Sequence, residues 1–173
     1  LMAAFTVIDH TEVGAAGVAS WEVTGISASY DHLYLVASPR HNQAGYLDSM
    51  LFQLNSDSGT DYSQTRLGTN GSVFSNRSAT QITSELPADS VTANTFGAWT
   101  AWIPNYANTA NFKSVLIQGA VEGATTALNT FQVYVVAGLY SSTAAVSAVK
   151  LVGQGSDVFV QYSTFTLYGV TGA

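Results

Sequence analysis

Apolar and polar side chains alternate near the C-terminal end, in the stretch Leu151–Val170. Between Thr164 and Tyr168, the apolar Phe165 and Leu167 fall at every second position. This period of two is typical of a strand that has one buried face. We therefore predict a strand, a glycine-rich turn and a long closing strand here, with most of the other strands laid against the last one.

The rest of the chain has the same character. About ten candidate strands follow one another at the spacing of a sandwich or barrel, and no segment has a helical period. Asn70-Gly71 predicts a hairpin. Residues 75–97 are polar and predict a long surface connection with one helical turn, a detour that suits a jelly roll. We predict an all-β fold: a jelly-roll-like antiparallel β-sandwich that forms a single domain over residues 1–173, with residues 1–25 as an N-terminal arm or as edge strands.

Charged residues make up only 9% of the chain, whereas about 25% is usual in soluble domains. Hydrophobic residues make up 47%, so polarity must come from Ser, Thr, Asn and Gln. A free monomer normally uses charge to remain dispersed. The composition therefore favours a component of an assembly, whose surface is covered by other subunits.

Two classes of partner are disfavoured. The net charge is −6 and the five basic residues are scattered, which argues against nucleic acid. Near the start there is no basic region followed by a long apolar run, so we expect neither a secretion signal nor a membrane span. The chain has no cysteine and hence no disulfide or thiolate metal site.

The three histidines are His10, His32 and His41, and the first two follow aspartates. Neighbours on one strand point to opposite faces, so Asp31 cannot orient His32 locally. The sequence has no G-x-S-x-G nucleophile motif and no H-E-x-x-H motif. We therefore expect no enzyme activity, and we assign no catalytic, cofactor-binding or metal-binding residue and no cofactor.

Two features leave binding open. Asn55, Asp57 and Asp61 place oxygen side chains at alternate positions, loosely like a calcium loop, but the position of the bidentate Glu is occupied by Arg66. Asx turns explain the same residues without a metal. Trp99 and Trp102 point to opposite faces of one predicted strand, so one of them could be an exposed sugar-stacking platform, although core packing is the simpler interpretation.

Several short motifs from Tyr30 onward resemble a family of small structural proteins common in tailed bacteriophages and their prophages. The residues that carry the resemblance are Tyr30, Leu33, Leu35, Arg40, Asn55, Asp57, Gly59, Tyr62, Ser63, Ile103, Tyr106, Phe112, Lys113, Ser114, Gly155, Phe159, Ser163, Leu167, Tyr168, Gly169 and Val170. Residues 1–25 carry no such motif.

The resemblance implies a jelly-roll-like virion structural protein. Its implied role is a capsid decoration (cement) protein that binds the capsid exterior, with the major capsid protein and copies of itself, as a homotrimer, for partners. It would stabilise the shell by bridging capsomers. The small-residue segments 14–17 and 141–148 would then lie close to a partner.

Two alternatives stay open at this point. One is a tail-fibre or spike module that binds host-surface glycans through exposed Trp or Tyr side chains and the Asn/Asp loops. The other is a secreted jelly-roll carbohydrate-binding domain that uses calcium. Binding to a glycan array or a calcium-dependent melting temperature would favour either of them over a cement protein.

Overall fold

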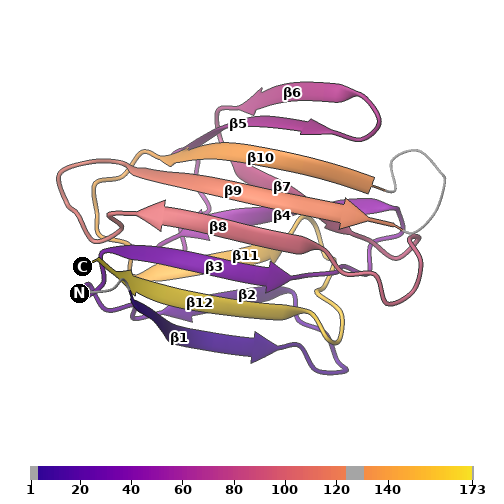
Figure 1. Cartoon of the computed structure of the whole chain (residues 1–173), viewed down its shortest axis with the longest axis horizontal. Helices are drawn as coiled ribbons and strands as arrows, with labels where there is room; N and C mark the ends of the chain where they lie inside the picture. Colours follow the sequence, from indigo (N-terminus) through magenta and orange to yellow (C-terminus); the bar gives the residue numbers. More distant parts are fainter. Residues whose placement is uncertain (1–3, 124–130, 173) are drawn as a thin grey trace.

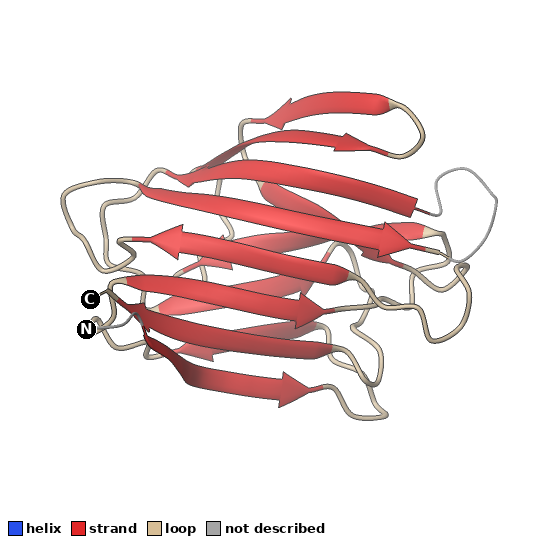
Figure 2. Ribbon diagram, viewed as in Figure 1, coloured by secondary structure: helices blue, strands red, loops and turns tan. Residues whose placement is uncertain are grey.

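A computed structural model describes residues 4–123 and 131–172. The described residues form strands and loops with no helix, which confirms the all-β prediction (Figure 2). The strands are β1 (Ala4–Glu12), β2 (Ser20–Thr24), β3 (His32–Ser38), β4 (Leu47–Leu54), β5 (Tyr62–Thr69), β6 (Val73–Ser78), β7 (Ile82–Pro87), β8 (Ala98–Pro104), β9 (Lys113–Glu122), β10 (Phe131–Tyr140), β11 (Ala148–Gly153) and β12 (Thr164–Thr171).

The strands form two antiparallel sheets that pack face to face (Figure 1). The larger sheet has eight strands in the order β1-β12-β3-β8-β9-β10-β5-β6, and the smaller has four in the order β2-β11-β4-β7. Strands far apart in the sequence are paired, so the fold depends on long-range contacts. Both β1 and β2 are edge strands, one in each sheet.

The pairing is nested in the manner of a rolled-up hairpin. β1 pairs with β12, β2 with β11, β3 with β8, and β4 with β7. These eight strands make the two four-stranded sheets of a jelly roll. The remaining strands, β5–β6 and β9–β10, extend only the larger sheet. The jelly-roll-like sandwich predicted from the sequence is therefore confirmed.

The core fills the space between the sheets. On β3, Leu33 and Leu35 point inward and are fully buried, as the alternation of apolar side chains requires. Trp21 of the smaller sheet stacks on Phe165 of the larger sheet, with ring centroids 5.3 Å apart. Trp99 is buried, and its indole N–H donates a hydrogen bond to Ser84 Oγ over 2.9 Å. Aromatic rings thus join the two sheets along their length.

Three predictions about elements need correction. Residues 75–97 contain most of β6 and all of β7, with no helical turn, because the alternate residues Ile82, Ser84 and Leu86 are buried against the core. The closing strand begins at Thr164, and Phe159 before it makes only isolated bridges. β12 pairs with β1 and β3 alone, so most strands are not laid against it.

The Asn70-Gly71 hairpin is confirmed. It joins β5 to β6, with Gly71 at a φ of 103°, and Thr69 pairs with Val73 across the turn. In Figure 1 this hairpin forms one margin of the larger sheet, with β6 as its edge strand. Every residue of β6 is exposed or half-buried. The larger sheet is therefore wider than the smaller sheet that covers its inner side.

Candidate interaction surface

The eight-stranded sheet has one face toward the core and one face away from it. We call the face that points away from the core the outer face. The strand registers arrange these side chains in rows that cross the sheet. One row contains Val7, Tyr168, Tyr34, Trp102, Leu116, Ala137, Thr65 and Arg77. The next contains His10, Thr166, Val36, Thr100, Gln118, Val135, Leu67 and Ser75. Apart from Arg77 at the edge of the sheet, each row mixes apolar side chains with polar side chains that carry no formal charge.

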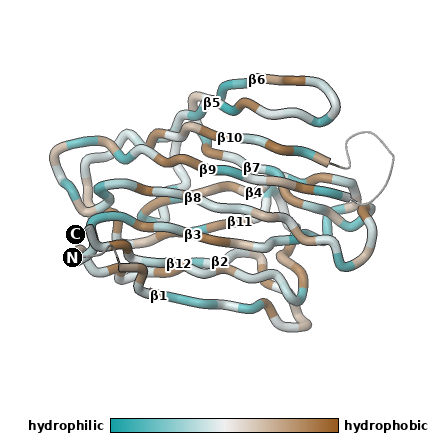
Figure 3. The backbone as a smooth tube through the Cα atoms, in the orientation of Figure 1, coloured by the Kyte–Doolittle hydropathy of each residue, from teal (hydrophilic) through white to brown (hydrophobic). Residues whose placement is uncertain are grey.

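An aliphatic patch covers the half of the outer face built from β9, β10, β5 and β6. Its members and their exposed fractions are Leu67 56%, Val73 81%, Leu116 44%, Val133 57% and Val135 41%. Shallow hollows lie on both sides of Val133 and Val135, one of them floored by small residues of β8 and β9. Figure 3 shows hydrophobic segments on several strands of this sheet. A sheet face that meets water is normally polar.

An aromatic patch covers the other half of the outer face. It consists of Phe5, His32, Tyr34, Trp102 and Tyr168. The Phe5 ring meets Tyr34 and Tyr168 edge-on at 5.9 Å and 6.0 Å between centroids. The Trp102 ring lies 5.0 Å from His32 and 6.0 Å from Tyr34. Trp102 is half-buried on this face, so core packing describes Trp99 but not Trp102.

Charge is confined to the border of the outer face. Among the described positions that the registers assign to it, the formally charged residues are Glu12 and Glu122 at strand ends and Arg77 on the edge strand β6. Contiguous apolar area of this kind marks a site of contact with another surface. The outer face is shallow, so it suits a broad partner better than an enclosed small molecule.

Sequence reasoning found the strands of this surface but misread their role. The segments 112–121 and 131–137 are rich in apolar residues, and this pattern predicts the strongest pair of core strands in the sequence. Their inward side chains, such as Ile117 and Val136, are indeed fully buried. Their outward side chains, such as Leu116 and Val133, are exposed because the smaller sheet covers only one side. The signal in the sequence is that both odd and even positions of these strands carry apolar residues, which places apolar side chains on both faces of the sheet.

Two of the histidines lie at the outer face. His10 Nδ1 is 2.8 Å from Thr166 Oγ1, and His32 Nδ1 accepts a hydrogen bond from the backbone N–H of Asn105 over 3.1 Å. The carboxylate of Asp31 accepts from the N–H of Gly172, so it does not orient His32. The His10 contact joins side chains of β1 and β12, and the His32 contact holds the backbone at Asn105.

His41 forms a pair that the sequence did not indicate. Its Nδ1 lies 2.5 Å from Asp48 Oδ2, and the ring packs on Phe159 with centroids 4.4 Å apart. The imidazole is fully buried, and a side chain at Gly153 would collide with it. A general base must reach its substrate. The enclosed His41 instead ties the loop after β3 to β4.

The candidate calcium loop uses its oxygens within the fold. Asn55 Oδ1 accepts from the N–H groups of Ser147 and Ala148, at 2.7 Å and 3.3 Å, and its Nδ2 donates to Ala145 O. Asp57 Oδ1 accepts from Gly59 N–H over 2.7 Å, which is an Asx turn. Among the described residues, no three His, Asp or Glu side chains are grouped to hold a metal ion.

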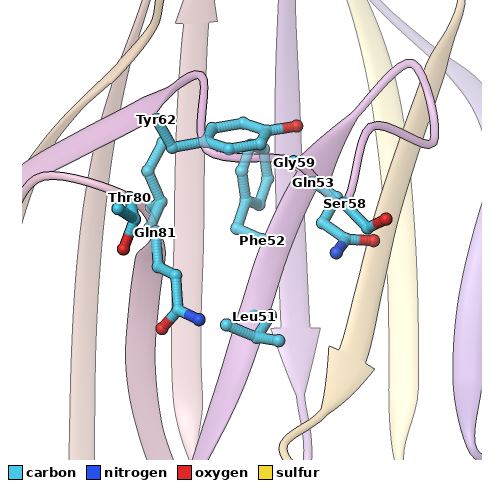
Figure 4. A pocket seen from close by; sticks show the side chains of 9 residues that line it. Leu51, Phe52, Gln53, Ser58, Gly59, Tyr62, Thr80 and Gln81 are labelled. Carbon is cyan, nitrogen blue, oxygen red and sulfur yellow. The ribbon is translucent and has the colours of Figure 1, made fainter.

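A small pocket lies between the end of β4 and the start of β7 (Figure 4). Its cavity volume is about 40 Å³, and it is lined by Leu51, Phe52, Gln53, Ser58, Gly59, Tyr62, Thr80, Gln81 and Ile82. The Tyr62 hydroxyl hydrogen-bonds the backbone at Leu54 and Asp57, and burial raises its pKa well above the usual value. The lining has no carboxylate, imidazole or amine, so it offers no acid–base pair.

Many residues that carry the family resemblance hold loops in place. The Arg40 guanidinium donates to four backbone carbonyls in residues 89–95, while its backbone N–H donates to Ser163 Oγ. The Tyr30 ring occupies the space where Gly169 lacks a side chain, and the Tyr30 N–H donates to the hydroxyl of Tyr106. These residues therefore specify the fold and lie apart from the aliphatic patch.

The small-residue loop 14–17 also has an explanation within the chain. Gly17 has a φ of 67°, and a Cβ there would lie 2.9 Å from Phe159 O. The glycine permits Val18 and Phe159 to exchange backbone hydrogen bonds. Close approach of backbones at Gly17 thus occurs within one chain.

No protein-family model, curated protein or solved structure matches this chain. No helix among the described residues is long and apolar enough to span a membrane.

Proposed function

We propose that this chain is a virion structural protein of a tailed bacteriophage, and specifically a decoration (cement) protein on the capsid exterior. It would bind the major capsid protein and copies of itself, as a homotrimer, and stabilise the shell by bridging capsomers. Its function is contact, with no substrate turned over. The observation that carries the proposal is the outer face, a broad uncharged surface with exposed aliphatic and aromatic patches.

Physical chemistry supports a contact function. Burying aliphatic side chains such as Val133 and Leu67 against a partner contributes about 25 cal/mol per Å² of apolar area. A protein that binds only the assembled shell stabilises it by mass action. The fold is compatible with this role but does not specify it, because jelly rolls also serve in lectins and enzymes. The motifs that resemble phage structural proteins supply the rest of the proposal.

The test is the location of the chain in purified phage particles. Cryo-electron microscopy should reveal a jelly roll on the outside of the capsid. Particles made without the chain should lose more infectivity after osmotic shock, and adding purified protein should restore their resistance. Absence of the chain from particles, or unchanged shock resistance without it, would contradict the proposal.

A glycan-binding module of a tail fibre or spike is the second candidate. The aromatic patch favours it, because the half-buried Trp102 and Tyr34 rings lie on the outer face beside the exposed Phe5. Aromatic rings combine apolar area with fixed geometry, which suits the C–H faces of sugars. Glycan-array binding that is lost in Trp102→Ala and kept in Val133→Asp would support this candidate over the cement protein.

A further inference from the structure

We infer that the outer face pairs two copies of this chain face to face, so that two eight-stranded sheets pack on each other across a two-fold axis. This inference goes beyond the proposed function, because it names the neighbour that covers the outer face. It does not rest on the virion role, since such a pair would form in a solution of the purified chain. The strand registers, the relief of the face and its charge carry the argument.

The size of the outer face matches what a stable dimer needs. Seven spacings of about 4.8 Å span about 34 Å across the eight strands, and four rows of outward side chains span about 20 Å along them. Including the bordering side chains, the outer face offers about 800 Å², which is the usual contribution of each partner to a specific interface. Sheets pack face to face in this way within single domains.

The ridge and hollows of the outer face suit packing against a second sheet. Val133 and Val135 form a ridge on β10, and hollows lie on either side of it. The floor of one hollow includes Ala98 and Ala120, whose small side chains leave room for a larger one. Ridges and hollows within one surface allow two identical faces to interdigitate.

The charge distribution favours a second copy. Each chain has a net charge of −6, so two copies repel each other in most relative orientations of approach. On the outer face the charged positions are Glu12, Glu122 and Arg77, and all three lie at its border. Two copies can therefore meet at its centre without burying like charges against each other.

This contact is distinct from the trimer contact proposed above. A face-to-face pair is isologous and closes with two copies, whereas a ring of three uses heterologous contacts. Whether monomers or trimers come together, loss of the outer-face contact halves the mass of the particle. The mass ratio between variant and wild type is therefore the informative quantity.

The first experiment measures mass by sedimentation velocity over a range of protein concentrations. Val133→Asp places a charge on the ridge, where the side chain is 57% exposed, so the monomer should still fold. We expect its mass to be half that of the wild type and the dissociation constant to rise at least about 100-fold. Tyr162→Asp is the matched control, because Tyr162 is 58% exposed in the loop before β12. It should keep the wild-type mass.

The second experiment uses the absence of native cysteine. In single-cysteine variants, Gln118→Cys on β9, at the middle of the outer face and therefore near the two-fold axis, should form an intermolecular disulfide under mild oxidation, and Tyr162→Cys should not. Circular dichroism confirms that each variant is folded. A wild-type chain that is monomeric at about 100 µM, well above the micromolar range of weak specific complexes, overturns the inference. Equal mass in wild type and Val133→Asp, or equal cross-linking at positions 118 and 162, overturns it too. None of these outcomes affects the particle-based test of the virion role.

Discussion

Arg40 should be the most stabilising single side chain among the polar residues of this fold. Arg40 is 6% exposed, and its guanidinium lies under the loop between β7 and β8. Nη1 donates to Thr92 O and Thr95 O at 2.9 Å and 3.0 Å, and Nη2 donates to Asp89 O and Val91 O at 3.3 Å each. The Arg40 side chain thus supplies the hydrogen bonds that regular secondary structure would otherwise give to the carbonyl groups of this loop.

The substitution Arg40→Met keeps the apolar stem and removes the donors. The two short hydrogen bonds to a charged group contribute about 1.5–3 kcal/mol each, and relief from burying the charge offsets part of their loss. We expect the free energy of unfolding to fall by about 3–4 kcal/mol. Arg40→Lys should lose less, because an ammonium group keeps some of the donors in a compact geometry.

Urea unfolding followed by circular dichroism measures this change at one fixed protein concentration, since association would shift the midpoint. With a slope of about 2 kcal/mol per M, the midpoint should fall by about 1.5–2 M. Arg77→Met, on the exposed edge strand β6, is the control and should change stability by less than about 0.5 kcal/mol. A loss below 1 kcal/mol in Arg40→Met would refute the view that the guanidinium organises the loop.

Three further predictions concern stability. Burial raises the pKa of Tyr62 and Tyr134 above 10, so the folded state holds these two protons more tightly than the unfolded state does. The free energy of unfolding should therefore fall as pH rises above 10, by about 1.4 kcal/mol per pH unit for each tyrosine. In urea titrations at pH 9–11, Tyr134→Phe should make this pH dependence less steep. Gly169→Ala should lower the free energy of unfolding by about 1–3 kcal/mol, because the added methyl group collides with the Tyr30 ring. In a double-mutant cycle, the same substitution in a Tyr30→Ala background should lower it by less. Asn55→Ala should lower the free energy of unfolding by about 2–3 kcal/mol, because it removes the hydrogen bonds to residues 145–148 and because alanine is less favourable than asparagine at a φ of 54°. An unchanged melting temperature would contradict this.

Local pattern was sufficient to predict most of the strands. The alternation around Phe165 and Leu167, the Asn70-Gly71 turn and the scarcity of helical period all follow from the geometry of single residues along the chain. The segment containing β7 was missed because Ile82 and Leu86 stand among polar residues, and only their packing on the larger sheet explains a strand there.

Contacts between distant residues escaped prediction for a different reason. His41 and Asp48 lie on a loop and a strand whose approach depends on how the sheets are wound. The carbonyls that Arg40 binds come from a loop about 50 residues later in the chain. Neither pairing has a sequence signature, because hydrogen-bond partners are selected by the path of the backbone in space.

The sequence by itself determined the all-β class, the uncharged character of the surface and the strands that build it. Which side of those strands meets water was decided by the tertiary structure. Val133, Val135 and Val136 look alike in the sequence, yet Val136 is fully buried and the other two are exposed. The physical reason is that four strands of the smaller sheet cover a single face of the eight-stranded sheet and leave the opposite face uncovered.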